Sequence, residues 1–266
     1  MGKYEVSTVR KLYIMWQADL RIVRLLFFTN LILLILVPLY YISLSAFGLT
    51  LAIGLYFLFG ALGIVATFHR FYSHRTFTFR RKITEKVWSL LGHLTGSGSA
   101  VGWVALHRLH HGHTDTKKDP HSPIHGLWKT MTLDYNFEGN QWRGIKDMLS
   151  EPYIRFFHNY YFAILLIYGL CLFIPFGIEG IYYGFIVPSV ITILMSGLTN
   201  YAAHIPRLGY RTYATKETST NAWWLALFNC GEGWHNNHHQ EPHNFTTKHK
   251  WWEFDMAGSL IRLVKQ

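Results

Sequence analysis

Two long stretches without acidic or basic side chains constrain the fold of this 266-residue chain. Residues 25–68 contain no Lys, Arg, Asp or Glu, and residues 156–205 contain only Glu179. A membrane-spanning helix needs about 20 predominantly apolar residues, so each stretch is long enough for two spans. Polar or turn-forming residues divide the stretches at 43–50 and 175–180. We therefore expect an all-α membrane protein with four transmembrane helices, near residues 25–44, 48–68, 157–176 and 181–199.

The distribution of basic residues predicts which side of the membrane each loop occupies. Neither predicted hairpin turn contains Lys or Arg. Several basic residues, including Arg21, precede the first span, and several, including Arg70 and Arg80, lie between the hairpins. Loops rich in Lys and Arg stay on the cytoplasmic side. We therefore expect a multi-pass integral membrane protein in which residues 1–266 form one domain. It would have two hairpins, cytoplasmic termini and a cytosolic helical cap.

The composition agrees with a protein that lies in a lipid bilayer. Half of the residues are hydrophobic, 17% are aromatic and only 15% are charged, which departs from the average of soluble domains. The net charge of +10 does not indicate a nucleic-acid partner, because the basic residues flank apolar spans and form no groove. A basic surface beside a bilayer attracts anionic headgroups. The two cysteines, Cys171 and Cys230, predict no disulfide framework.

Sixteen histidines include three tight clusters that point to metal binding. Two clusters have the spacing i, i+3, i+4, which places three rings on one helical face. The first has i, i+5, which needs a helix end or a bend. Imidazole suits iron, zinc and copper, and these histidines exceed what one four-coordinate ion could use. We therefore expect two metal ions at the membrane surface; the alternative is a polar face near lipid headgroups. The clustered histidines are His69, His74, His107, His110, His111, His235, His238 and His239, with His204 at the end of an apolar segment.

The clusters resemble the histidine boxes of the membrane fatty-acid desaturases. They read His-x-x-x-x-His, His-x-x-His-His and Gly231-Glu-Gly-Trp-His-Asn-Asn-His-His239. Asp119-Pro-His-Ser-Pro123 and Asn200-Tyr-Ala-Ala-His204 are similar to stretches of the stearoyl-type acyl desaturases. The resemblance covers about residues 20 to 260. One departure precedes the second box, where many relatives carry a Gln-Gly pair and this chain has Thr95-Gly96-Ser97-Gly98, which bears on the lining of the substrate channel.

The resemblance implies a set of site residues around two iron ions. Asn200 would approach one metal through a water molecule, or else cap the cytosolic end of its span. Asp115, Asp119 and Glu232 lie close to the boxes and are candidate acceptors for the second ring N–H of metal-bound histidines. Zinc can replace iron in purified protein, because nitrogen ligands bind zinc more tightly than ferrous iron. The implied metal ligands are His69, His74, His107, His110, His111, His204, His235, His238 and His239.

The implied function is an oxygen-dependent fatty acyl desaturase that introduces a cis double bond at the Δ9 position of a saturated chain. Breaking an unactivated C–H bond is chemistry that belongs to a cofactor, here with O2 as co-substrate and two electrons from an external cytochrome b5-like or ferredoxin-like protein. Acyl-CoA, acyl carrier protein and acyl lipid stay open as substrates. So do the endoplasmic reticulum and the bacterial inner membrane as locations. Gly60, Ala61 and Trp103 are candidate residues of the substrate tunnel; the alternative role of the small ones is close helix packing.

Other classes of protein fit the sequence less well. A related membrane di-iron hydroxylase of acyl chains or other lipids is the nearest alternative, because hydroxylation and desaturation share the first C–H cleavage. A metal transporter would carry polar or ionisable residues within its spans, and these spans have none near their middle; a bis-His membrane haem protein would show a haem absorption band in the visible. A zinc protease of the His-Glu-x-x-His type is excluded because that motif is absent.

Overall fold

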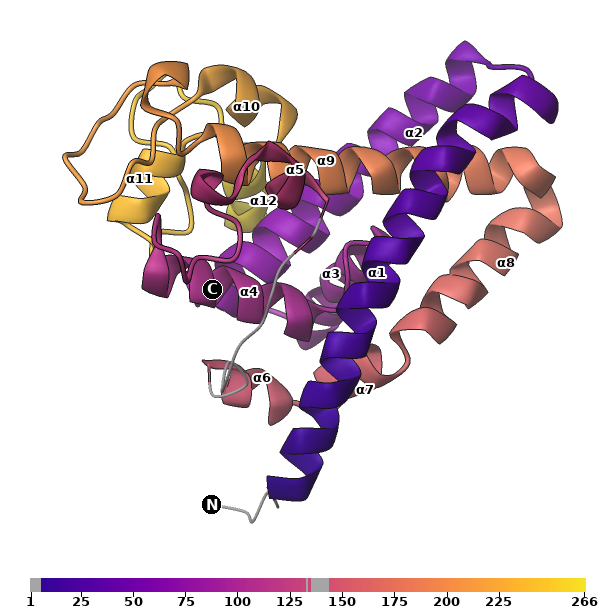
Figure 1. The fold of residues 1–266 in the computed structure, drawn as a ribbon, viewed down its shortest axis with the longest axis horizontal. Helices are drawn as coiled ribbons and strands as arrows, with labels where there is room; N and C mark the ends of the chain where they lie inside the picture. Colours follow the sequence, from indigo (N-terminus) through magenta and orange to yellow (C-terminus); the bar gives the residue numbers. More distant parts are fainter. Residues whose placement is uncertain (1–5, 133, 135–143) are drawn as a thin grey trace.

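Three apolar segments form the frame of the molecule. The computed structural model describes residues 6–132, 134 and 144–266, with side chains described from residue 21 onward in the first helix, α1 (Val6–Tyr40). The segments that are long and apolar enough to cross a membrane are Arg21–Tyr40, Ala46–Ser73 and Tyr161–Ala202. The turns of both hairpins lie on one side of the molecule, away from the helices α4, α10, α11 and α12 (Figure 1). This arrangement fits a membrane protein.

The first hairpin joins α1 to α2 (Ala46–Phe59), which continues as the π-helix η1 (Gly60–Ser73). The turn lies between Tyr40 and Ala46, where the sequence predicted a polar break. Its Ser45 side chain accepts a hydrogen bond from the Gly48 amide at 3.0 Å, which satisfies a free N–H at the start of α2. The second segment extends to Ser73, beyond the predicted end near residue 68.

The third apolar segment folds back on itself. It consists of α8 (Tyr161–Ile181), η4 (Tyr182–Ile186) and α9 (Val187–Ala202), and Gly177 interrupts the helical backbone with φ 59° and ψ −146°. The Tyr168 hydroxyl donates to the Gly184 carbonyl at 2.8 Å, which joins α8 to η4 near the bend; beyond it, α8 and α9 diverge (Figure 1). The bend falls in the predicted turn at 175–180. The structure therefore has three apolar segments, one of them bent, and the count of four membrane crossings stays a prediction.

Short helices build the remainder of the molecule. The described residues contain isolated β-bridges but no named strand. The helices before α8 are α3 (Lys82–Leu94), α4 (Ala100–His113), η2 (Pro123–His125), α5 (Leu127–Met131), α6 (Lys146–Leu149) and α7 (Pro152–Asn159). Those after α9 are η5 (Pro206–Leu208), α10 (Trp223–Phe228), α11 (His235–Gln240) and α12 (Met256–Val264). An all-helical fold was predicted and is confirmed for the described part of the chain.

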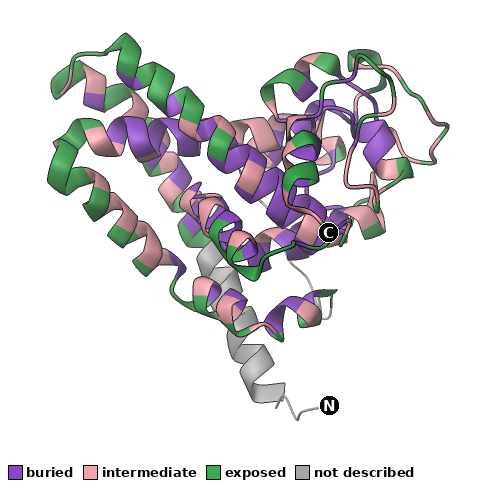
Figure 2. Ribbon diagram, turned by 180° about the vertical axis from the view of Figure 1, so that it is seen from behind, coloured by how far each residue is buried: buried purple, intermediate pink, exposed green. Residues whose placement is uncertain are grey.

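Burial is concentrated where η1 meets the short helices. Purple ribbon gathers along η1 and its neighbours, whereas green dominates the far ends of the hairpins (Figure 2). Those far ends expose large apolar side chains such as Leu39, Phe47 and Ile174, which suits contact with lipid tails. Gly63 allows the close approach of α3 to η1, because a Cβ there would lie 2.2 Å from the Gly92 amide nitrogen. The buried end of η1 therefore becomes a fixed base for the histidine clusters.

Candidate metal centre

Nine histidines gather into two groups at the buried end of η1. In each group, one potential ligand atom per residue lies within 4.8 Å of every other. The five-histidine group contains His69, His74, His107, His111 and His238. The four-histidine group contains His110, His204, His235 and His239. The structure thus brings together all nine histidines that the sequence singled out, and each group could hold one metal ion.

Four elements supply these side chains. Helices α4 and α11 carry the clusters spaced i, i+3, i+4, and His204 follows the end of α9. The first cluster depends on η1, because a π-helix pairs residues five apart instead of four. The Ser73 hydroxyl follows the same winding and donates to the Phe68 carbonyl at 2.8 Å. This winding, together with the helix end at Ser73, aims the rings of His69 and His74 at the same volume.

The Nε2 atoms of the histidines face one another at distances that suit a shared metal. His69 Nε2 lies 2.9 Å from His238 Nε2, and His74 Nε2 lies 2.8 Å from His107 Nε2. In the four-histidine group, His239 Nε2 lies 3.1 Å from His235 Nε2 and 3.3 Å from His110 Nε2. Two nitrogens each about 2.1 Å from one ion are about 3.0 Å apart when their bonds meet at a right angle. The donor set therefore fits two cations.

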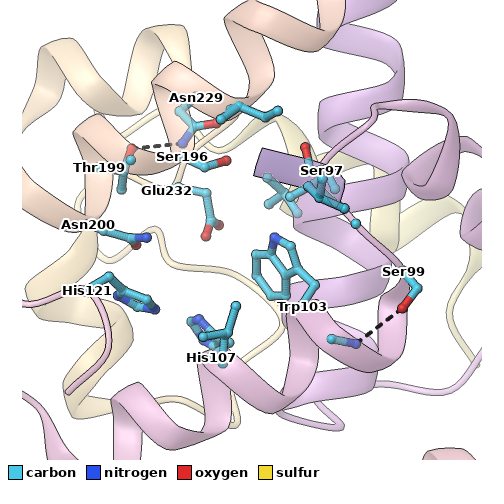
Figure 3. A pocket seen from close by; sticks show the side chains of 18 of the residues that line it. Ser97, Ser99, Trp103, His107, His121, Ser196, Thr199, Asn200, Asn229 and Glu232 are labelled. Carbon is cyan, nitrogen blue, oxygen red and sulfur yellow. Dashed lines mark hydrogen bonds between the residues drawn. The ribbon is translucent and has the colours of Figure 1, made fainter. Parts of the chain in front are cut away.

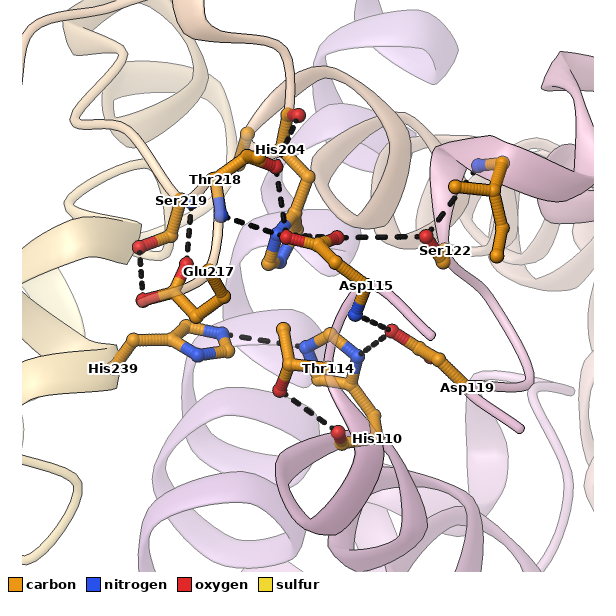
Figure 4. A network of polar contacts seen from close by, with 12 residues as sticks. His110, Thr114, Asp115, Asp119, Ser122, His204, Glu217, Thr218, Ser219 and His239 are labelled. Carbon is orange, nitrogen blue, oxygen red and sulfur yellow. Dashed lines mark hydrogen bonds and ion pairs between the residues drawn. The ribbon is translucent and has the colours of Figure 1, made fainter. Parts of the chain in front are cut away.

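Three carboxylates lie beside the Nδ1 nitrogens on the opposite side of these rings, and His110 is hydrogen-bonded to its carboxylate. His110 Nδ1 lies 2.9 Å from Asp119 Oδ2, and His204 Nδ1 lies 3.2 Å from Asp115 Oδ1 (Figure 4). His69 Nδ1 is in short contact with Glu232 Oε2. An Nδ1–H donated to a carboxylate leaves the Nε2 lone pair free for a metal and fixes the ring orientation. Asp115, Asp119 and Glu232 were the three acceptors suggested by the sequence, and each faces a different histidine.

Burial and pairing set the charge of the groups around the two sites. Burial lowers the pKa of His107, His110 and His235 well below the ordinary value, so these rings are neutral, which is the ligand form. Burial also opposes ionisation of Glu232, but the neighbouring His69 and Arg70 outweigh it and hold the pKa of this carboxyl below its usual range. Asp119 differs, because burial raises its pKa to about 6. Neutral rings surrounded by carboxylates favour a cation between them.

A cavity of about 90 Å³ reaches both histidine groups. His107 and His235 line it, as do Asn200, His121 and Glu232 (Figure 3). Asn200 belongs to neither group and lies in the cavity wall beside them. The wall also contains Val23, Ile64, Ser97, Gly98 and Ile193.

Of the predicted tunnel residues, one lines the cavity and the others lie outside it. Trp103 lines the cavity, and its indole stacks on the His107 ring with centroids 5.1 Å apart. Gly60 and Ala61 do not line it. Ala61 packs instead against Val65, Cys230 and Ala257, which is the close-packing role considered for the small residues. The stretch that departs from the Gln-Gly pattern, in contrast, contributes Ser97 and Gly98 to the cavity wall.

Two arginines beside the boxes escaped the sequence analysis as site residues. Arg70 follows His69 and is 1% exposed, in contact with Glu232 and Asp255. Arg108 follows His107 and donates to the Ser73 carbonyl at 3.1 Å and to Asp147. Arg108 therefore ties the second box to the end of the first. The predicted second span ended near residue 68, so Arg70 lay outside it in the sequence, and only the structure places Arg70 within the apolar segment Ala46–Ser73.

Comparison with known proteins identifies relatives over most of the chain. Residues 45–262 match the family model described as fatty acid desaturase. The sn-1 stearoyl-lipid 9-desaturase of Anabaena variabilis is 35% identical over 227 residues, which cover 84% of this chain and 82% of that protein. The sn-2 palmitoyl-lipid 9-desaturase of Nostoc sp. (strain 36) is 31% identical over 255 residues, 93% of this chain and 88% of that protein. An acyl-CoA 5-desaturase of Anemone leveillei is 33% identical over 229 residues, covering 84% and 70%.

Proposed function

Because this chain belongs to the fatty acid desaturase family and is thus an oxidoreductase of lipid metabolism, we propose that it introduces a cis double bond at the ninth carbon of a saturated acyl chain held in a membrane lipid. The two relatives that share more than four fifths of their length with it are named as lipid 9-desaturases. A relative of similar identity is named as an acyl-CoA 5-desaturase. Both the lipid carrier and the position of the double bond therefore belong to the proposal.

Two iron ions held by the nine histidines are the proposed cofactor. When bound, they supply the oxidising power, drawn from O2 and two electrons, that breaks the two unactivated C–H bonds. The balance is one O2, two electrons, two protons and a saturated –CH2–CH2– unit, which give –CH=CH– and two waters. Iron and zinc share this ligand chemistry, so we expect overexpressed protein to carry some zinc and to be inactive to that extent. The observation that supports the proposal best is the convergence of nine Nε2-bearing rings on two points.

The residues of the cavity would hold the acyl chain against these sites. Apolar side chains such as Val23, Ile64 and Ile193 line it, and burial of a methylene contributes about 0.8 kcal/mol. The Trp103 indole, stacked on His107, would cover that ring and limit the access of water. Asn200 in the wall would hold a water molecule beside the four-histidine group.

The proposed topology has four membrane crossings, with both termini and all histidine boxes in the cytoplasm. The fold-back at Gly177 supports it, because each half of the third segment then makes one crossing. The electrons would come from a separate cytochrome b5-like or ferredoxin-like protein that approaches from the same side. Either the endoplasmic reticulum or a bacterial inner membrane would satisfy this arrangement.

Expression in a host that lacks its own desaturase tests the function directly. We expect membranes with monounsaturated acyl chains whose double bond, located by mass spectrometry, starts at the ninth carbon. The His107→Ala variant should yield none. Hydroxylated chains in place of unsaturated ones would favour the related hydroxylase reaction. Membranes supplied in parallel with labelled stearoyl phospholipid and labelled stearoyl-CoA separate the two carriers, because only the lipid should be converted without prior acyl transfer.

A further inference from the structure

Arg70 is a fully buried charge inside an otherwise apolar segment. Its side chain is 1% exposed and lies within Ala46–Ser73. An arginine in such a place is tolerated only when its charge is paired and its donors are bonded. The identity of the partners therefore indicates the role of the residue.

The guanidinium of Arg70 has two arms with different partners. One arm, Nη1, donates to Asp255 Oδ2 at 2.8 Å and to the Phe245 carbonyl at 3.0 Å. The other arm, Nη2, donates to Glu232 Oε1 at 3.1 Å and to Thr247 Oγ1 at 3.3 Å. The first arm ties η1 to the segment that leads into α12. The second reaches Glu232 in the third histidine box and also Thr247 in the segment that leads into α12.

Glu232 connects Arg70 to a histidine of the five-histidine group. While Oε1 accepts from Arg70, Oε2 contacts His69 Nδ1. The Nε2 atom of the same ring faces His238 Nε2 at 2.9 Å. A continuous path thus runs from the Arg70 guanidinium through the Glu232 carboxylate to the nitrogen that would hold the metal.

We propose that Arg70 is a positioning residue of the five-histidine group, acting through Glu232. By fixing one oxygen of Glu232 it aims the other at His69, which holds the Nδ1 proton there and leaves the Nε2 lone pair for the metal. This inference rests on the proposed metal-dependent function. Arginine suits the task because its planar fork serves two carboxylates at once, which the single ammonium group of lysine cannot do with the same geometry.

Among the residues that the structure describes, no arginine contacts the carboxylates of the four-histidine group. Asp115 Oδ2 accepts from the Thr218 amide at 2.7 Å and from its hydroxyl at 2.8 Å. Asp119 accepts from the backbone amides of Asp115 at 3.0 Å and of His121 at 3.1 Å. Loss of Arg70 should therefore weaken one metal site and spare the other. A purely structural defect would not make this distinction.

The two arms of Arg70 allow the positioning role to be separated from a structural one. The Glu232→Gln substitution alters the arm that leads to His69. The Asp255→Asn substitution alters the arm that leads to α12, and it retains a side chain able to cap that helix. If Arg70 acts through Glu232, then Arg70→Gln should resemble Glu232→Gln and not Asp255→Asn.

The experiment measures iron and zinc per protein by mass spectrometry after purified full-length enzyme has been equilibrated with a graded series of chelator. We expect the wild type to lose both metals at high chelator concentration. Arg70→Gln and Glu232→Gln should each lose one of the two at a concentration about 10- to 100-fold lower, the usual effect of removing an outer hydrogen-bond partner of a metal ligand. The double variant should be no worse than either single variant, because both act on one path. Asp255→Asn should keep both metals, even with a lower Tm.

Each contrary result has a separate meaning. Arg70→Gln that retains both metals as tightly as wild type overturns the inference and leaves the proposed function intact. A metal loss shared by Arg70→Gln and Asp255→Asn but not by Glu232→Gln assigns Arg70 a structural role and also overturns it. Wild-type protein without any transition metal overturns the proposed function and the inference with it. Should Arg70→Gln fail to fold, Arg70→Lys keeps the charge without the fork, and the same selective loss of one metal is expected.

Discussion

Two histidines of α4 allow the predicted metal ligands to be compared with a histidine outside both groups. His107 belongs to the five-histidine group, whereas His113, at the end of the same helix, belongs to neither group. We expect His107→Ala to abolish product formation and to lower the metal content, because one ligand is lost. His113→Ala should keep both. The measurement is fatty-acid analysis of expressing cells together with metal content; wild-type activity in His107→Ala would contradict the ligand assignment.

Asp119 gives the four-histidine group a pH dependence of known sign. Burial raises the pKa of Asp119 to about 6, and the ionised carboxylate accepts the His110 Nδ1 proton at 2.9 Å more strongly than the neutral carboxyl group would. As the pH falls through about 6, Asp119 takes up a proton and this support is weakened, whereas the histidines stay neutral because burial lowers their pKa. Retention of one metal should therefore decline below about pH 6 in dialysed protein. Asp119→Asn should remove that step; an unchanged pH profile in this variant would assign the decline to another group.

The sequence could predict contacts of single residues only where the contacting residues lie close together along the chain. The rings of the second and third boxes share a helical face because of their spacing, so their convergence could be anticipated. The carboxylates Asp115, Asp119 and Glu232 could be suggested because they lie near a box in the sequence. The network of Arg70 could not, because Glu232 and Asp255 lie 162 and 185 residues further along the chain.

At the scale of elements, the contact between η1 and α3 depends on glycine at one position of the second apolar segment. A Cβ at Gly63 would lie 2.2 Å from the Gly92 amide nitrogen, whereas a Cβ at Gly54 meets nothing within 4 Å. We expect Gly63→Ala to destabilise the protein by about 1–3 kcal/mol through overpacking. Gly54→Ala should be neutral or stabilising by up to about 1 kcal/mol, because alanine favours the helix. Thermal unfolding in detergent compares the two, and equal Tm values would show that α3 can move away from η1.

The positions of the helical hairpins could be predicted from the sequence, whereas the π-helical form of η1 could not. Hairpin turns follow from polar and turn-forming residues between apolar runs, and the turns before Ala46 and at Gly177 occur where such residues stand. The π-helical winding of η1 has no counterpart in hydrophobic spacing, because it depends on packing against α3, α4 and α12. The i, i+5 pair of His69 and His74 indicated only that a regular α-helix would not suffice.

At the scale of the whole molecule, the two hairpin turns should emerge on the same side of the membrane. If each half of the bent third segment crosses once, Ser43 and Gly180 lie opposite the histidine groups. We expect single cysteines at these positions, introduced after replacement of Cys171 and Cys230, to react with an impermeant maleimide only from the non-cytoplasmic face. A cysteine at Lys117, beside the second box, should react only from the cytoplasmic face. Labelling of position 180 from the cytoplasm would mean that the third segment enters and leaves the membrane on one side.

The cavity is a property of the whole molecule, because its wall is drawn from distant segments. Val23 comes from α1, Ile64 from η1, Ile193 from α9 and Ser97 from the loop before α4. No local sequence pattern predicts which distant segments meet in this wall. Among the predicted tunnel residues Gly60, Ala61 and Trp103, only Trp103 lines it. The stretch that departs from the Gln-Gly pattern contributes Ser97 and Gly98 to the wall.

The part of the cavity wall that Ser97 forms should therefore help to decide which acyl lengths are accepted. Ser97 is partly exposed in the wall, so Ser97→Phe should fill space that a long chain needs and leave the histidine groups unchanged. If two terminal methylenes lose their place, a stearoyl chain is disfavoured relative to a palmitoyl chain by about 1.6 kcal/mol, roughly 15-fold. Gly54→Phe adds similar bulk where nothing lies within 4 Å and should leave the ratio of products unchanged. A uniform loss of activity in Ser97→Phe, with both metals retained and no change in that ratio, would mean that the acyl chain ends elsewhere.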